Sequence, residues 1–386
     1  MRFFLQAIFG QIFLNAYIIW QGCRVFPPKS VGRRLFILFF LFELLLYFLG
    51  YFFYKDLPDS IFLPVMMICN TWYIASIYIA LGLLILYLAR VVIKKVGPPL
   101  TPPKEGNNSK FKIQNSKFAF FLNSQLFILL VVVVAGLMVK GYHNAVYPIV
   151  RHLEIHIPKT VEGKESLTIL IMSDLHIGEA IGKKHVRRMV ELCNAESPDL
   201  VVIAGDILDY ESRWAEKAHI EEDLQRLNAP LGVYITLGNH EYRANRFAKI
   251  RWIEKTGGIL LVDSVAMPDA TFYLIGRDDV INGERATLET LLQGVDRTKP
   301  VIVIEHQPVF VEDMIESQCD LGLYGHTHNG QYWPFSLLLK FALRYPYGYY
   351  TKGGSHIYVS SGAGFAGPPF RIGTRSEIVV IRLRFN

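Results

Sequence analysis

Hydrophobic residues fill four long stretches within the first 150 residues. The stretches run from about Phe3 to Trp20, Leu35 to Tyr54, Pro64 to Ala89 and Phe118 to Val139. Each is close to the length of about 20 residues with which a helix crosses a hydrocarbon core about 30 Å thick. The first stretch is too apolar and too long for a signal peptide, and no small-residue cleavage site precedes Arg24. The pattern therefore predicts a membrane domain of four transmembrane helices over residues 1–150.

From Arg151 onward the pattern changes to short apolar strands that alternate with amphipathic helical stretches. The expected strands are Leu153–Ile157, Leu167–Met172, Leu200–Ala204, Val233–Leu237, Ile259–Val262, Thr271–Ile275, Val301–Ile304, Leu321–Tyr324, Ile357–Ser360 and Ile378–Arg384. Helices are expected at His185–Asn194, with Val186, Met189, Val190 and Cys193 on one face, and at Ala215–Leu227. Alternation of this kind is typical of a layered α/β domain, here over residues 151–386.

The net charge changes sign at the same boundary. Before Arg151, 14 Lys and Arg residues face 4 Asp and Glu residues, a balance of +10, and the remainder has 26 against 30, a balance of −4. The formal charge of +6 thus belongs to the flanks of the membrane segments, and no nucleic-acid partner is expected. The four cysteines show no paired spacing and leave the redox compartment open.

The distribution of basic residues predicts an orientation in the membrane. Lys and Arg collect in the first and third loops, whereas the second loop has only Lys55 beside Asp56 and Asp59. Because positive loops stay in the cytoplasm, four crossings put both termini and the second domain on the extracytoplasmic face of the cell membrane. Residues Gly97–Lys117, rich in Pro, Gly, Asn and Ser, are expected to form a flexible linker.

Glu43 lies near the centre of the second apolar stretch. An ionised carboxylate is costly there and is often functional. No basic partner within the membrane is visible in the sequence, so a protonated side chain, or one paired with a neighbouring helix, is the favoured interpretation.

Polar side chains follow five of the expected strands. They are Asp174 and His176; Asp206 and Asp209; Asn239, His240 and Glu241; His306; and His326 and His328. Residues that bind ligands gather past the carboxyl ends of strands in α/β sheets. The glycines before Asp206, Asn239 and His326 let the backbone turn sharply and approach a ligand. Any one of these residues could be a satisfied core histidine, a helix cap or a turn residue, but the set has no shared structural explanation.

Oxygen and imidazole ligands without thiolate favour Mn, Fe, Zn or Mg ions. A carboxylate can bridge two such ions, and ions about 3.5 to 4 Å apart clamp a phosphoryl group and lower the pKa of a shared water. The set therefore predicts two divalent metal ions and a hydroxide nucleophile that bridges them.

The same residues resemble the signature of the calcineurin-like metallophosphoesterase family from about Leu167 to the C-terminus. The matching motifs are Asp174-x-His176, Gly205-Asp206-x-x-Asp209, Gly238-Asn239-His240-Glu241, His306 and Gly325-His326-Thr327-His328. The resemblance implies a four-layer αββα sandwich with a dinuclear metal site. It implies a first metal bound by Asp174, His176 and His328, a second bound by Asn239, His306 and His326, and Asp206 as the bridge. His240 would stay off the metals and stabilise or protonate the leaving oxygen.

The glycine-rich tail Ser360–Gly373, with Gly325–Gln331, resembles a membrane-associated subgroup of the family that includes a UDP-diacylglucosamine hydrolase. Arg371 could contact a substrate phosphate or form a surface ion pair. Arg243 is a further candidate for substrate contact, for support of a ligand or for capping. The segment Pro334–Pro346 has one apolar and one polar helical face, which suits either an interfacial helix or ordinary packing.

These features together predict a membrane-bound, two-metal phosphohydrolase that cleaves a phosphoester or pyrophosphate bond, with a lipid headgroup as the expected substrate. The alternatives are a phosphodiesterase or phosphatase of soluble substrates that is merely tethered to the membrane, and a scaffold that binds without catalysis.

Overall fold

The computed structural model describes the backbone of residues 2–53, 57–96 and 108–386, and the side chains of residues 8–50, 52–53, 57–89, 91–92 and 124–386. The chain divides into two compact units, residues 1–139 and 140–386. The predicted domain boundary at residue 150 falls inside the first strand, β1 (Ile149–His156).

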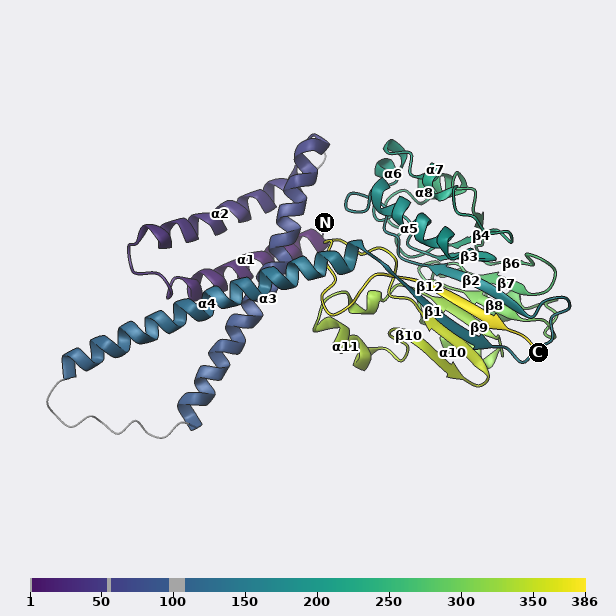
Figure 1. The fold of residues 1–386 in the computed structure, drawn as a ribbon. Coiled ribbons are helices and arrows are strands. Elements are labelled where there is room, and N and C mark those ends of the chain that lie inside the picture. The colour runs from purple at the N-terminus through teal and green to yellow at the C-terminus, as the bar shows by residue number, and fades with distance from the viewer. Residues whose placement is uncertain (1, 54–56, 97–107) are drawn as a thin grey trace. The chain divides into compact units, whose positions relative to one another are not determined.

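The first unit is helical (Figure 1). Its helices are α1 (Arg2–Gly22), α2 (Val31–Phe52), α3 (Asp59–Val96) and α4 (Asn108–Val146), whose end belongs to the second unit. Each predicted apolar stretch lies on one of these helices, apart from Tyr54, which lies outside the described residues. Among the described residues, Asp59–Ala89 and Ser124–Val146 are the two helical segments long and apolar enough to cross a membrane. Helix α2 is not one of them, because Arg33, Arg34 and Glu43 interrupt the apolar residues of its described part.

The predicted linker Gly97–Lys117 was wrong in its second part. Residues 97–107 lie outside the described residues, but the backbone from Asn108 onward is already helical as the start of α4. No proline follows Pro103 in this region, so nothing in the sequence stops the helix from beginning there.

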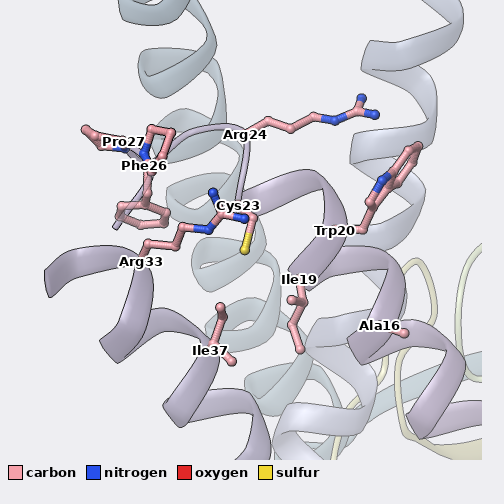
Figure 2. Close-up of a pocket in the computed structure, with 10 residues that line it drawn as sticks. Ala16, Ile19, Trp20, Cys23, Arg24, Phe26, Pro27, Arg33 and Ile37 are labelled. Atoms are coloured by element: carbon pink, nitrogen blue, oxygen red, sulfur yellow. The ribbon is translucent and has the colours of Figure 1, made fainter. Parts of the chain in front are cut away.

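Helices α1, α2 and α3 pack against one another through aromatic and small side chains. Trp72 of α3 meets Phe39 and Phe40 of α2 edge to face, with ring centroids 5.1 and 5.2 Å away. A cavity of about 860 Å³ lies where α1 passes into α2, lined mostly by apolar groups together with Arg24 and Arg33 (Figure 2). The Arg24 guanidinium stacks on Trp20, 4.0 Å from the ring centroid. This end of the bundle thus carries the basic residues of the first loop.

The second unit contains two six-stranded sheets. The first has the order β1-β12-β2-β3-β4-β5, with β12 (Glu377–Arg384), β2 (Ser166–Met172), β3 (Leu200–Ala204), β4 (Val233–Thr236) and β5 (Ile259–Leu260). The second has the order β10-β11-β9-β8-β7-β6, with β10 (Gly348–Lys352), β11 (Ser355–Val359), β9 (Leu321–Tyr324), β8 (Val301–Ile304), β7 (Tyr273–Gly276) and β6 (Ser264–Ala266). Strands β2, β3 and β4 run parallel, as do β7, β8 and β9, so the carboxyl ends within each set share one edge.

Alternation of side chains along each strand explains the layers. In β2, Leu167, Ile169 and Ile171 join a core between the two sheets, whereas Leu170 and Met172 join a core on the outer face. That outer core includes the buried face of α5 (Lys183–Ala195), with Val186, Met189, Val190 and Cys193 as predicted, and residues of α8 (Arg246–Glu254). A third core joins the second sheet to α9 (Leu288–Leu291) and α10 (Val311–Glu316). The mixed sheets therefore lie between helical layers.

Two local predictions differ from the structure, and a third segment forms the helix that the sequence allowed. The single helix expected at Ala215–Leu227 is two short helices, α6 (Arg213–Lys217) and α7 (Glu221–Leu224), because His219 has a left-handed backbone (φ 48°) that interrupts the helix. Strands β6 and β10 were not expected, and each lies at an edge of its sheet. The segment Pro334–Pro346 forms α11 over Phe335–Ala342. Tyr347, Tyr349 and Tyr350 follow this segment, and the last two lie in β10.

Candidate metal centre

The loops after β2, β3 and β9 hold five of the predicted ligands in left-handed backbone conformations. The φ angles are 52° for Asp174, 46° for His176, 52° for Asp206, 71° for His326 and 50° for His328. Non-glycine residues adopt this region at a cost of order 1–3 kcal/mol each, and such residues cluster at functional sites. Backbone hydrogen bonds tie the first two loops together, since His176 N donates to Asp206 O (3.0 Å).

Two glycines permit the close approach of these loops, as the sequence predicted. A Cβ atom on Gly238 would lie 2.2 Å from Asp206 Oδ1, and one on Gly325 would lie 2.6 Å from Asp174 Oδ2. Both contacts are far shorter than van der Waals distance. A larger residue at either position would push a carboxylate out of the site.

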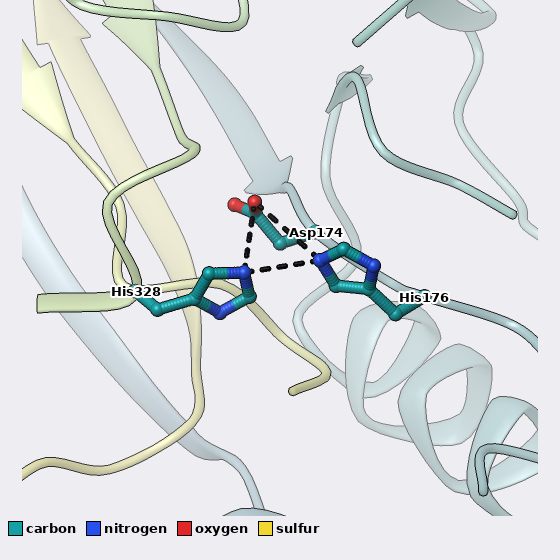
Figure 3. A group of neighbouring side chains, drawn as sticks. All are labelled: Asp174, His176 and His328. Atoms are coloured by element: carbon teal, nitrogen blue, oxygen red, sulfur yellow. Dashed lines mark hydrogen bonds and ion pairs between the residues drawn. The ribbon is translucent and has the colours of Figure 1, made fainter. Parts of the chain in front are cut away.

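The first group of ligands is Asp174, His176 and His328 (Figure 3). His176 Nε2 lies 3.0 Å from His328 Nε2, and Asp174 Oδ1 lies 3.4 Å from His328 Nε2 and 3.9 Å from His176 Nε2. All three side chains are buried. Three donor atoms from two distant loops therefore converge on one small volume.

The second group surrounds the carboxylate of Asp206. Asp206 Oδ2 lies 3.1 Å from His306 Nε2 and 3.7 Å from His176 Nε2. Asp206, His306 and His326 form one cluster with ligand atoms within 4.8 Å of one another. The same carboxylate oxygen therefore faces histidines of both groups, which is the placement expected of a bridging ligand.

Asn239 completes the set that the sequence predicted. It lies directly after the loop that follows β4 and is 6% exposed, and its Oδ1 atom has no hydrogen-bond partner among the described residues. A buried amide oxygen without a partner costs free energy, so this atom is suited to a ligand that carries positive charge.

The electrostatics of the group favour positive charge around Asp206. Burial raises the pKa of Asp206, but His306, His176 and His240 together lower it well below its usual range. Burial lowers the pKa of His306, but the Asp206 carboxylate more than offsets this and raises that pKa to about 10. Burial, with the neighbouring His176 and Arg371, lowers the pKa of His328. A carboxylate at the centre thus holds its charge, and the surrounding imidazoles compete for protons.

His240 lies beside these groups, and Asp209 holds its ring on the side that faces away from Asp206. Its Nδ1 lies 2.9 Å from Asp209 Oδ1, and its Nε2 lies 4.0 Å from Asp206 Oδ2. Asp209 Oδ1 also lies 3.5 Å from His176 Nδ1, so one carboxylate lies beside both rings.

Lys249 of α8 was not predicted. It is 1% exposed, and its Nζ donates to the backbone oxygens of His240 (2.7 Å) and Asp209 (3.0 Å). A periodicity signal for it exists, because Lys249, Trp252 and Ile253 share the buried face of α8 at helical spacing. This lysine fixes the loop that carries His240.

Glu241 holds the backbone of two ligand loops. Its carboxylate accepts hydrogen bonds from the N–H groups of Asp206 (2.9 Å), Ile207 (3.0 Å), Leu208 (3.0 Å) and Gly238 (2.8 Å). All four donors are satisfied by one buried side chain, so Glu241 orients the backbone of both loops.

The two arginines proposed from the sequence have different settings. Arg371 is fully buried, and its guanidinium donates to His328 Nδ1 (3.0 Å) and to backbone oxygens of His328, Ser361 and Gly364. It therefore supports His328, and its complete burial corrects the surface ion pair, whereas the contact with a substrate phosphate stays a prediction. Arg243 is exposed, three residues after His240.

The donor set fits divalent metal ions. It offers carboxylate and amide oxygens and imidazole nitrogens with no thiolate, a combination that suits Mn, Fe, Zn or Mg. The convergence of His176 and His328 Nε2 atoms and the unpartnered Asn239 Oδ1 both suit a bound positive charge. Metal-dependent chemistry is what this arrangement can support.

Comparisons with known proteins agree with this geometry. Residues 167–330 match the family model described as calcineurin-like phosphoesterase. The chain is 30% identical over 261 residues to a metallophosphoesterase of Campylobacter jejuni, covering 66% of this chain and 68% of that one. A Caenorhabditis elegans protein that carries the metallophosphoesterase name is 26% identical over 380 residues, covering 93% of this chain and 75% of its own. A Danio rerio protein named as a transmembrane protein with a metallophosphoesterase domain is 31% identical over 274 residues, covering 67% of this chain and 62% of its own.

The family match spans every loop that supplies a residue of the centre, from Asp174 to His328. The chain belongs to the calcineurin-like metallophosphoesterase family and is a metal-dependent phosphoesterase.

Proposed function

We propose that this protein is an integral-membrane phosphohydrolase that holds two divalent ions across Asp206 and cleaves a phosphoester or pyrophosphate bond of a lipid headgroup. The observation that carries the two-metal part is the position of Asp206 Oδ2, which faces His176 on one side and His306 on the other. One carboxylate oxygen shared by two groups of ligands is what a bridged pair of ions requires.

Asp174, His176 and His328 would hold one ion, and Asn239, His306 and His326 the other, with Asp206 common to both. When bound, such ions neutralise charge on a phosphoryl group and lower the pKa of a water molecule. Six of these seven ligands are buried and His326 is partly buried, which limits competition from solvent. Manganese is the ion we would test first.

The residues around the ions have separate tasks in this proposal. His240 presents Nε2 toward the centre while Asp209 holds Nδ1, so His240 can stabilise or protonate the leaving oxygen. Lys249 fixes the backbone of His240 from the opposite side. Arg243, exposed and close in sequence, is the candidate for contact with the substrate phosphate.

For the membrane part, we propose that all four helices cross the bilayer. The support is the two apolar segments of α3 and α4, the aromatic packing of α2 on α3, and the transmembrane name of the Danio rerio relative. The basic first and third loops then lie in the cytoplasm, and the catalytic unit lies on the extracytoplasmic face of the cell membrane.

Helix α11 supports a substrate at the membrane surface. None of its residues is buried, and Leu338 and Phe341 are 56% and 83% exposed. Lys340 lies on the same helix and Arg344 follows it, which suits contact with anionic headgroups. The ordinary packing that the sequence left open would have buried the apolar face.

The position of α11 in the second unit points the same way. Trp333, just before the helix, donates its backbone N–H to Ile372 O, and Arg371 N donates to Gly141 O at the end of α4. Because Ser124–Val146 is one of the apolar segments, α11 lies near the place where that segment would leave the bilayer. The resemblance of the tail Ser360–Gly373 to the membrane-associated subgroup, which includes a lipid hydrolase, is a further reason for this proposal.

A comparison of two substrates tests the proposal. Wild-type protein and Asp206→Asn are assayed with Mn²⁺ on a soluble aryl phosphate and on vesicles that contain anionic phospholipids. We expect Asp206→Asn to lose hydrolysis of both substrates. Unchanged activity on both would refute the metal mechanism.

A second pair of variants tests the membrane surface. Phe341→Asp should lower hydrolysis of vesicle lipids and leave the soluble ester unaffected, because it puts a charge on the exposed face of α11. Ile259→Asp, at an exposed apolar position on the edge strand β5, is the matched control. Equal losses for the two variants, or activity on soluble esters alone, would favour a tethered phosphatase of soluble substrates. A reporter fused after Asn386 that is active only in the cytoplasm would overturn the orientation.

A further inference from the structure

A buried polar cluster joins three helices of the first unit, away from the metal centre. It comprises Gln11 and Asn15 of α1, Glu43 of α2, and Trp72 and Ser76 of α3. Gln11 and Ser76 are 0% exposed, and Asn15 and Glu43 are 3% exposed. The surrounding helices are apolar, so each of these polar groups costs free energy unless it has a partner.

One carboxylate oxygen of Glu43 accepts two hydrogen bonds in the cluster, and the other accepts none from the described residues. Glu43 Oε2 accepts hydrogen bonds from Asn15 Nδ2 (2.9 Å) and Gln11 Nε2 (3.2 Å). Asn15 Oδ1 accepts one from Trp72 Nε1 (3.1 Å), and Gln11 Oε1 accepts one from Ser76 Oγ (3.4 Å). Both amide oxygens are thus already occupied. Glu43 Oε1 is buried and has no hydrogen-bond partner among the described residues.

The charge of Glu43 is also uncompensated in the described part of the bundle. Arg33 and Arg34 are the basic residues of α2, and they precede Glu43 by nine or ten residues, which is about 14 Å along a helix. The titratable side chains of α3 that lie within the bundle are Cys69, Tyr73 and Tyr78, and none of them can carry positive charge. The described side chains of α1 in the bundle include no acid or base.

We propose that Glu43 is a binding site for a single monovalent positive charge, either a proton or Na⁺, inside the helical unit. The atom left over is an acceptor, Oε1, and the neighbouring amides present donors to Oε2, so a cation or a proton satisfies the cluster and an anion does not. The site is independent of phosphoester hydrolysis. It gives the helices a bound ligand of their own, which ties α1, α2 and α3 together when the positive charge is in place.

Labelling with a hydrophobic carbodiimide tests this site on the wild-type full chain in phospholipid nanodiscs. The reagent reacts with protonated carboxyls in apolar surroundings, and mass spectrometry of the peptide that contains Glu43 measures the modified fraction. In choline chloride at neutral pH, Glu43 should be labelled, and labelling should fall as the pH becomes alkaline. If the ligand is a proton, replacing choline by Na⁺ changes nothing; if it is Na⁺, sodium protects Glu43. Absence of labelling at every pH in choline would overturn the proposal.

Two variants provide a second readout. Glu43→Gln imitates the neutral side chain, so its thermal unfolding should not respond to pH or to Na⁺ where that of the wild type does. Ser76→Ala removes a hydroxyl at the margin of the cluster and should keep the wild-type response. A response to pH and Na⁺ that is identical in Glu43→Gln and wild type would contradict the site, and the labelling result stands even if one variant fails to fold.

Discussion

Replacing Glu241 by Gln tests whether one buried carboxylate holds the two loops that carry Asp206 and Asn239. The carboxylate accepts four backbone hydrogen bonds, two at each oxygen. Glutamine keeps one acceptor oxygen and puts an NH₂ group in the other position, so two of the backbone N–H groups lose their acceptor. Hydrogen bonds to charged groups contribute about 1.5–3 kcal/mol each, so the loops should lose about 3–6 kcal/mol of local stability.

Hydrogen exchange measures this loss directly. A local loss of about 3 kcal/mol accelerates exchange by more than about 100-fold, since each 1.4 kcal/mol is about tenfold. Mass spectrometry of peptides that contain residues 206–208 and 238, in chelator-treated full chain, gives the rate. Glu312→Gln is the control, because this partly exposed carboxylate forms surface contacts with Arg344 and Lys352 and should change exchange by no more than about threefold. Exchange at residues 206–208 that is no faster in Glu241→Gln than in this control would refute the role of Glu241.

Three further predictions concern the centre. Gly238→Ala should abolish tight Mn²⁺ binding in titration calorimetry, because its Cβ would lie 2.2 Å from Asp206 Oδ1; binding of wild-type strength would contradict the packing. Lys249→Met should lower kcat but leave the metal content at the wild-type level, because the hydrogen bonds of Lys249 go to the His240 and Asp209 backbone and not to a metal ligand's side chain; loss of metal would instead make it part of the metal site. The pKa of His306 is raised to about 10, so in metal-free protein its pairing with Asp206 stabilises the fold fully below about pH 6.5 and less as the pH rises towards about 10. An incoming ion must displace that proton, so Mn²⁺ affinity should rise with pH over this range and calorimetry in two buffers should detect proton release; pH-independent affinity would show that His306 is not a ligand.

The ligand set could be predicted from the sequence because each residue follows a short apolar run. The predicted bounds agree with the observed ones for the strands Leu200–Ala204, Val301–Ile304 and Leu321–Tyr324. Buried parallel strands are continuous apolar segments between polar turns, which makes their ends visible in the sequence. Strand β3 belongs to the first sheet and β8 and β9 belong to the second, so Asp206 and His326 come together only when the two sheets pack, without any contact being visible in the sequence.

The supporting residues could not be predicted in the same way. Arg371 reads as a surface or substrate arginine because its partners, the carbonyls of Ser361 and Gly364 and the ring of His328, are fixed only by folding of the tail. Lys249 has a periodicity signal, but a lysine on an apolar helical face has no local reason to be buried. The interruption between α6 and α7 at His219 involves no glycine or proline, so the sequence contains no signal for it.

The amphipathic segment at Pro334–Pro346 shows a different limit. Its periodicity predicts an apolar face but not the partner of that face, and only the structure shows that Leu338 and Phe341 are left exposed. Glu43 is similar, because the sequence shows a carboxylate in an apolar stretch but not the amides of Asn15 and Gln11 that surround it.

The most direct test of the two-metal centre is the metal content of the purified full chain after reconstitution with Mn²⁺ and removal of free ions. The arrangement of Asp174, His176, Asp206, His306, His326 and His328 predicts two ions per chain in the wild type and fewer than two in Asp206→Asn. A wild-type chain that retains no ion, or an Asp206→Asn chain that retains two, would contradict a centre bridged by Asp206.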